Sequence, residues 1–183
     1  MALPPKVTRR TFLMLSFLLA SILPDLPVLE AQAQAGRVGR VTRLDLPRFV
    51  SLKASKARLR VGPGVQYPVK WEYLAPNIPL EVIAEFGNWR RVRDWTSAEG
   101  WMYHTLLAGR RTAVVSPWRA GVTSLRRYPS AHASIPASLE SGVFVEVEDC
   151  SGTWCKVQIK GAELEGYIQQ IALWGVYPGE VVR

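Results

Sequence analysis

One pattern occurs twice in this chain, at a spacing of about 66 residues, from residue 57 onward. The matched segments, in chain order, are Leu59-Arg60 with Leu125-Arg126, Gly62-Pro63 with Tyr128-Pro129, Trp89 with Trp154, and Gly100-Trp101-Met102 with Gly166-Tyr167-Ile168. Matches that keep their order at one offset, with a single-residue slip at the tryptophan, indicate a duplicated structural unit. The duplication constrains architecture more than activity, and it predicts two small domains of one kind.

The first 35 residues have the features of an export signal. A basic segment that ends in Arg9-Arg10 precedes an apolar run over residues 12–23, and small-x-small cleavage sites end at Ala33 or Ala35. The apolar run has only about 12 residues, short of the roughly 20 that a transmembrane helix needs. We therefore predict a cleaved signal peptide over 1–35, no transmembrane segment in the mature chain, and export to the periplasm or cell envelope. The paired arginines resemble a twin-arginine signal, so both that route and the general secretory route stay open.

The chain is basic, with 23 Lys and Arg against 15 Asp and Glu and a net charge of +8. The predicted signal peptide holds three of the basic and two of the acidic residues, so the mature chain stays basic. An exported basic protein meets cell-wall polymers, anionic lipid surfaces and envelope proteins rather than nucleic acid. The alternative is that the charge only maintains solubility.

The secondary structure is predicted to be β throughout. Each copy holds a strand-like pair joined by a Gly-containing turn, then a Glu-Gly-aromatic strand, then a short Leu-rich step that suits one helical turn. The predicted strands are 79–86, 89–94 and 99–103 in the first copy, and 142–148, 154–160 and 165–168 in the second. Short strands at close spacing with Gly and Pro turns predict an all-β fold with one small barrel per copy.

Cys150 and Cys155 are the only cysteines of the chain. A four-residue spacer with glycine, between two strand-like runs, places them on opposite arms of a hairpin and within disulfide reach in an oxidising compartment. The spacing is not that of a C-x-x-C redox motif. A zinc site is not expected either, because His132 alone is no adequate set of further ligands. We predict a structural disulfide and no metal.

The ordered motifs of the first copy resemble those of the bacterial SH3-like (Src-homology-3-like) domain family. They are Leu59-Arg60-Val61-Gly62-Pro63-Gly64, then Trp89-Arg90-Arg91-Val92, then Glu99-Gly100-Trp101-Met102. The second copy keeps Trp154 and Val157 but has Tyr128-Pro129-Ser130 in place of Gly-Pro-Gly. The resemblance implies two tandem SH3-like barrels. We place the divisions of the chain at a mobile linker over 36–48, a first domain over 49–112, a second over 113–178 and a tail over 179–183.

Strand alternation suggests where a ligand would bind. If Val92 is in the core, then Trp89, Arg91 and Arg93 face the other side, because residues an odd number of positions apart point to opposite faces. In peptide-binding SH3 domains a tryptophan three residues before a core residue lines the ligand groove, and Trp89 resembles it. Trp154 has the same place in the second copy, and Tyr67 and Tyr73 are candidates to complete an aromatic platform with Trp89.

An aromatic surface with arginines suits a sugar-peptide or an extended peptide that carries carboxylates, through stacking, cation–π contacts and charge-assisted hydrogen bonds. The alternative is that these aromatic residues cover the barrels or fill the contact between domains. Trp101 and Tyr167 are expected to serve packing, and Trp118, Trp174 and Tyr177 are expected at the interdomain contact.

No catalytic constellation is visible in the sequence. His104 and His132 have no nucleophile beside them in the chain and are expected to be solvated. The acidic residues are scattered, and no phosphate loop, nucleophile elbow or metal-ligand cluster occurs. We therefore predict a non-enzymatic binding module without a cofactor that recognises peptidoglycan. The alternative is an envelope interaction or assembly module that binds an acidic or extended peptide segment, and a hydrolase ranks third.

Overall fold

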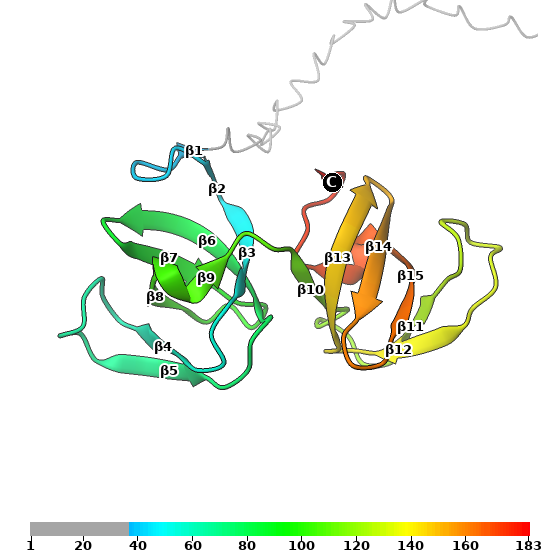
Figure 1. The fold of residues 1–183 in the computed structure, drawn as a ribbon, viewed down its shortest axis with the longest axis horizontal. Coiled ribbons are helices and arrows are strands. Elements are labelled where there is room, and N and C mark those ends of the chain that lie inside the picture. The colour runs from blue at the N-terminus through cyan, green and yellow to red at the C-terminus, as the bar shows by residue number, and fades with distance from the viewer. Residues whose placement is uncertain (1–36) are drawn as a thin grey trace, which may run out of the picture. The chain divides into compact units, whose positions relative to one another are not determined.

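The structure is a computed structural model that describes residues 37–183, so the predicted signal peptide lies outside the described residues. The described chain consists of short strands and two single-turn 3-10 helices (Figure 1). This confirms the predicted all-β fold class. Within residues 37–183 there is no helix with the length and apolar character needed to span a bilayer.

The first repeat is built on a seven-stranded sheet with the strand order β5-β4-β8-β7-β6-β3-β9, in which all neighbours are antiparallel. The strands are β3 (Arg48–Leu52), β4 (Ala57–Arg60), β5 (Val69–Tyr73), β6 (Pro79–Phe86), β7 (Trp89–Arg93), β8 (Glu99–Tyr103) and β9 (Leu107–Ala108), and the helical turn η1 (His104–Leu106) follows β8. Gly87, with a φ of 49°, and Asn88 make the tight turn between β6 and β7.

The second repeat reproduces this plan in a six-stranded sheet and a two-stranded sheet. The six strands are β10 (Thr112–Val115), β13 (Phe144–Ser151), β14 (Trp154–Ile159), β15 (Leu164–Gln169), β16 (Leu173–Trp174) and β17 (Val181–Val182). The smaller sheet pairs β11 (Val122–Leu125) with β12 (Ala137–Glu140), and the turn η2 (Gln170–Ala172) follows β15. The helical turn predicted after each closing strand is therefore confirmed.

Each repeat has its own apolar core, supplied by alternate residues of its strands. Val92 and Val157 are fully buried, as alternation predicts, and Cys155 lies on the core side beside Val157. The other fully buried large side chains include Leu52, Leu59, Leu80, Val82 and Met102 in the first core and Leu125 and Ile168 in the second. The disulfide between Cys150 and Cys155 links β13 to β14, which confirms the predicted pairing.

The glycine of each Glu-Gly-aromatic strand is needed for close packing. A Cβ atom on Gly100 would lie 2.6 Å from Leu59 Cγ and 2.7 Å from the carbonyl oxygen of Arg60. A Cβ atom on Gly166 would meet Leu125 Cγ and the carbonyl oxygen of Arg126, both at 2.7 Å. A side chain at either position would push the strand that carries the glycine away from the strand that carries the Leu-Arg pair. The glycine is therefore needed in each repeat because these two strands lie close together.

Strands lie in three segments at the predicted domain boundaries. Residues 37–48, predicted as a mobile linker, hold a hairpin of β1 (Arg37–Val38) and β2 (Asp45–Leu46) and the first residue of β3. Thr112, predicted to end the first domain, begins β10 of the second sheet. The predicted tail contributes β17, which pairs with β13. Short segments of this kind have little periodicity of their own, and distant partners order them.

Aromatic side chains make contacts between the repeats. Phe49 lies edge-on to Trp174, with ring centroids 5.0 Å apart, and packs against Tyr177 at 4.6 Å. The Tyr177 hydroxyl donates to Glu81 at 2.9 Å. Trp174 and Tyr177 therefore lie at the interdomain contact, as predicted. Trp118, which was predicted at the same contact, is 56% exposed.

Candidate functional site

A groove of about 420 Å³ opens beside Trp89 in the first repeat. It is lined by Lys56, Ala57, Arg58, Arg60, Val65, Trp89, Tyr103 and Leu106. These residues come from β4 and the residue before it, the loop after β4, the start of β7, the end of β8 and η1. The lining is therefore assembled from segments up to about 50 residues apart in the chain.

The aromatic wall of this groove is formed by Trp89 and Tyr103. The two residues are cross-strand partners on β7 and β8, and their rings meet edge to face with centroids 5.5 Å apart. Both side chains are half-buried, and Leu106 of η1 adds an aliphatic surface beside them. Paired rings of this kind offer a rigid apolar surface for stacking.

Three other lining residues of the groove, Lys56, Arg58 and Arg60, are cationic. Lys56 Nζ lies 3.1 Å and Arg58 Nε 3.2 Å from the carboxylate of Glu72. These hydrogen bonds lower the pKa of Glu72, and the bond from Lys56 has the larger effect of the two. One carboxylate thus serves two cations, and Arg60 adds a third positive charge to the lining. The groove carries an excess of positive charge.

Arg60 also shapes the groove, because its Nη1 donates to the carbonyl oxygen of Tyr67 at 2.7 Å. This bond spans the loop that carries Val65 into the groove. The Tyr67 ring occupies the space where a Cβ on Gly62 would be, 2.5 Å from the nearest ring atom. Gly62 is therefore needed for this loop to fold on itself.

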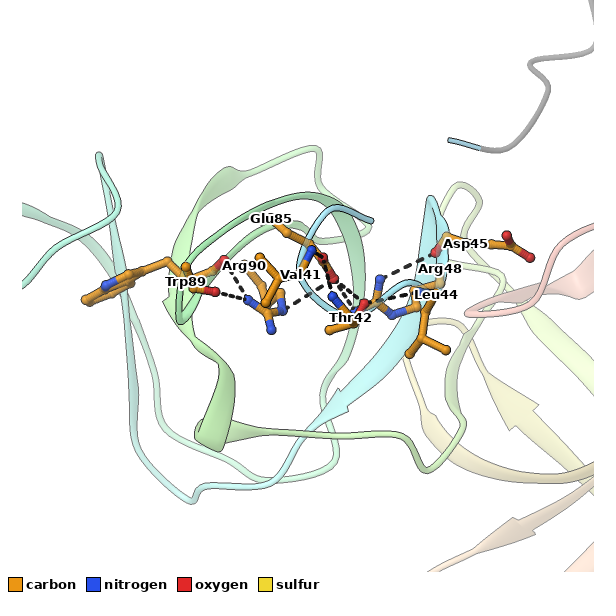
Figure 2. Close-up of polar contacts among 9 residues, drawn as sticks. Val41, Thr42, Leu44, Asp45, Arg48, Glu85, Trp89 and Arg90 are labelled. Atoms are coloured by element: carbon orange, nitrogen blue, oxygen red, sulfur yellow. Dashed lines mark hydrogen bonds and ion pairs between the residues drawn. The ribbon is translucent and has the colours of Figure 1, made fainter. Parts of the chain in front are cut away.

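The neighbouring residue Arg90 stabilises the backbone at Trp89, and its side chain is buried, with 7% exposed. Arg90 Nη1 donates to the carbonyl oxygens of Gly87 at 2.8 Å and Trp89 at 3.0 Å, and its Nε lies 3.6 Å from Glu85 (Figure 2). These contacts fix the backbone of the β6–β7 turn, and the turn sets the position of Trp89 at the groove.

The second repeat carries a groove of about 230 Å³ at the corresponding place. It is lined by Arg119, Val122, Thr123, Ser124, Arg126, Ala131, Trp154, Gln169 and Ala172. All eight lining residues of the first groove have their counterparts here, 65 residues on for the tryptophan and 66 for the others. Arg126 Nη1 donates to the carbonyl oxygen of Ala133 at 2.8 Å, and this repeats the contact of Arg60 with Tyr67.

Only some of the predicted site residues lie at the grooves. Trp89 and Trp154 each line a groove. Tyr67 is 39% exposed but packs over its own loop and lines neither groove. The prediction for Tyr73 is wrong: it is 4% exposed, its hydroxyl donates to Asp94 at 2.8 Å, and its burial raises the pKa of that hydroxyl. Tyr73 ends β5 on the core side, so it cannot join an exposed platform.

Arg91 and Arg93 share the outward face of β7 with Trp89, as alternation predicts, but they line neither groove. Arg91 donates to Glu99 at 2.7 Å, and Arg93 Nε donates to Glu81 at 2.9 Å. The positive charge at the first groove comes instead from β4 and from Lys56 just before it. The repeated Leu-Arg pair was the sequence signal for Arg60, whereas nothing in the sequence indicated Lys56, Tyr103 or Leu106.

His104 and His132 are both exposed, as predicted. In the part of the chain that the structure describes, no group of three or more His, Cys, Asp or Glu side chains is placed to hold a metal ion.

Comparison with known proteins identifies the repeats. The family described as "Bacterial SH3 domain" matches residues 53–109 and again residues 121–175. NlpC2 from Trichomonas vaginalis is similar in structure, with 15% identity and a TM-score of 0.32 over 70% of this chain and 48% of that one. NlpC1 from the same organism has 14% identity and a TM-score of 0.32 over 74% of this chain and 48% of that one. The chain thus spans about half the length of either structure, and no curated protein matches it. The family match covers more than half of the sequence, so this chain belongs to the bacterial SH3 domain family and carries two tandem copies of the domain.

Proposed function

We propose that this chain is a non-enzymatic binding module of the bacterial cell envelope and that it recognises peptidoglycan. The observation that carries the proposal is the Trp89 groove, whose lining combines two paired aromatic rings with an excess of cationic side chains. Support for the compartment comes from the predicted signal peptide and from the Cys150–Cys155 disulfide, because disulfides persist in oxidising compartments.

The chemistry of the groove matches that of a sugar-peptide polymer. A sugar ring or an apolar peptide side chain stacks on Trp89 and Tyr103, while a carboxylate of the peptide is attracted to Arg58 and Arg60. An arginine has five N–H donors. Arg60 uses one of them on its own loop, so its guanidinium retains donors for a ligand. Open grooves with aromatic walls and cations bind extended, acid-bearing chains.

A sedimentation assay with purified insoluble peptidoglycan tests the proposal. We expect the mature protein to co-sediment at low salt and to bind less at moderate salt, because screening weakens exposed charge contacts. Trp89→Ala is expected to weaken binding by up to about tenfold, the effect of removing one stacking contact of roughly 0.5–1.5 kcal/mol. Trp71→Ala is the matched control, since Trp71 is 56% exposed in the same repeat but lies outside the groove. Absence of co-sedimentation, or equal loss in both variants, contradicts the proposal.

A second candidate function is recognition of an envelope protein, and an exposed apolar strip of the first repeat favours it. The strip consists of Val69, Trp71 and Leu74, all at least 45% exposed, whereas Val65 belongs to the groove lining. It lies on β5, an edge strand of the first sheet, and on the residue that follows this strand. An exposed apolar edge strand is a typical docking place for an extended segment of another protein. Loss of partner binding in Trp71→Ala with wall binding intact would assign this strip to a protein.

A further inference from the structure

The two grooves share their positions but not their chemistry. The tryptophan and one arginine are kept, as Trp89 with Trp154 and Arg60 with Arg126. Most of the other lining residues are replaced by smaller or polar ones. Tyr103 is replaced by Gln169, Leu106 by Ala172, Val65 by Ala131 and Arg58 by Ser124. The second groove therefore keeps one aromatic surface, loses the aromatic partner and the aliphatic wall, and gains uncharged hydrogen-bonding groups.

The second groove also has its own arrangement of charge. Lys56 of the first groove is replaced by Val122, and Arg119, which has no counterpart in the first lining, supplies a second cation. Among residues 37–183, neither Arg119 nor Arg126 takes part in an ion pair. In the first groove, by contrast, Glu72 neutralises part of the charge. Two guanidinium groups without carboxylate partners thus border a groove that carries no acidic residue in its lining.

The size of the second groove limits what it holds. Its volume of about 230 Å³ is close to half that of the first groove and lies below the roughly 300–1,000 Å³ typical of sites for drug-sized ligands. The second groove therefore suits a smaller group than the first, such as a single sugar residue.

From these observations we infer that the Trp154 groove is a separate site for one acidic sugar residue, distinct in specificity from the Trp89 groove. The inference rests on the proposed function, since it assumes a module that binds envelope polymers. The apolar face of a pyranose ring stacks on Trp154, and its hydroxyl groups exchange hydrogen bonds with Ser124 and Gln169. Its carboxylate binds Arg119 and the donors of Arg126 that do not hold the loop. Arg–carboxylate contacts of this kind are among the stronger polar contacts in proteins.

Heteronuclear NMR of the mature two-repeat protein tests the inference, because each tryptophan gives its own indole N–H signal. Trp154→Phe and Trp89→Phe assign the two signals. The probes are glucuronate, glucose, which lacks the carboxylate, and acetate, which lacks the ring. We expect millimolar glucuronate to shift the Trp154 signal in a saturable way and to shift the Trp89 signal less, because Glu72 neutralises part of the positive charge beside Trp89. Glucose and acetate are each expected to bind at least about tenfold more weakly, since each lacks one set of contacts.

Two variants sharpen the test. Arg119→Gln removes an exposed cation that has no ion-pair partner in the described chain, and it should weaken glucuronate binding about tenfold while the spectrum stays that of a folded protein. Arg127→Gln is the matched control, because Arg127 is exposed in the same repeat and lies outside the groove lining. Equal weakening in both variants would show a general charge effect and would overturn the inference.

The remaining outcomes also decide the matter. An unmoved Trp154 signal, equal shifts of Trp89 and Trp154, or acetate binding as tight as glucuronate binding would each overturn the inference. The sedimentation assay on insoluble peptidoglycan with Trp89→Ala is read independently. Wall binding without a Trp154 response therefore refutes only the second site, and a Trp154 response without wall binding refutes only the proposed function.

Discussion

The hydrogen bonds between Glu85 and the N-terminal hairpin of residues 37–46 allow a prediction about stability whose magnitude can be worked out from the structure. Glu85 Oε2 accepts the backbone N–H groups of Val41 and Thr42, both at 3.0 Å. Its Oε1 accepts the Thr42 hydroxyl at 2.6 Å and Arg48 Nη2 at 2.9 Å (Figure 2). The Glu85 side chain is 1% exposed. The hydrogen bonds of one buried carboxylate therefore hold the hairpin of residues 37–46 against β6.

The pKa of Glu85 gives the magnitude. Burial by itself raises this pKa, but the hydrogen bonds from Thr42, Val41 and Arg48 outweigh burial and lower it from 4.5 to about 2. At about 1.4 kcal/mol for each pKa unit, the ionised form contributes about 3 kcal/mol to the folded state. Because the folded pKa lies below the unfolded one, this contribution is complete above about pH 4.5 and is lost as the pH falls toward 2.

Glu85→Gln keeps the shape of the side chain and removes its charge, leaving Arg48 and Arg90 without their carboxylate. We expect the variant to lose about 3 kcal/mol at pH 7 and to lose little at pH 2.5 relative to the parent. Hydrogen exchange of the Val41 and Thr42 amides measures the opening of the hairpin, and urea unfolding measures the whole repeat.

Glu99→Gln serves as the control, since Glu99 pairs with the half-exposed Arg91 and such a pair contributes at most about 1 kcal/mol. The reasoning is refuted if Glu85→Gln costs less than about 1 kcal/mol at pH 7, or if its cost is the same at both pH values.

Three further changes test the packing of the repeats. Gly100→Ala should lower the stability of the first repeat by about 1–3 kcal/mol through overpacking, whereas Gly109→Ala, with open space around it, should be near neutral in thermal unfolding. Titration of the native protein should find no free thiol, and replacing Cys150 and Cys155 together by Ser should cost about 2 kcal/mol in the second repeat only. Val92→Asp should unfold the first repeat, because it buries an unpaired carboxylate; a native-like circular dichroism spectrum would place Val92 outside the core.

The sequence by itself determined the local features of this protein. The 66-residue offset predicted two copies of one unit, since a duplicated unit repeats its strand and turn residues in order. Alternation placed Val92 and Trp89 on opposite faces of one strand, because successive side chains of a strand point to opposite sides, and Val92 is the buried one. The cysteine spacing predicted the disulfide, since a hairpin turn brings its two ends together.

Only the tertiary structure decided which side chains meet. Tyr73 was predicted to join the aromatic platform, but it ends β5 on the core side, whereas Tyr103, which the sequence did not indicate, lies across from Trp89. The hairpin over residues 37–46 has almost no pattern of its own and is fixed by Glu85, about 40 residues further along the chain. Local periodicity reports the face on which a residue lies, whereas a groove depends on how distant strands pair, and that pairing is set by the packing of the whole core.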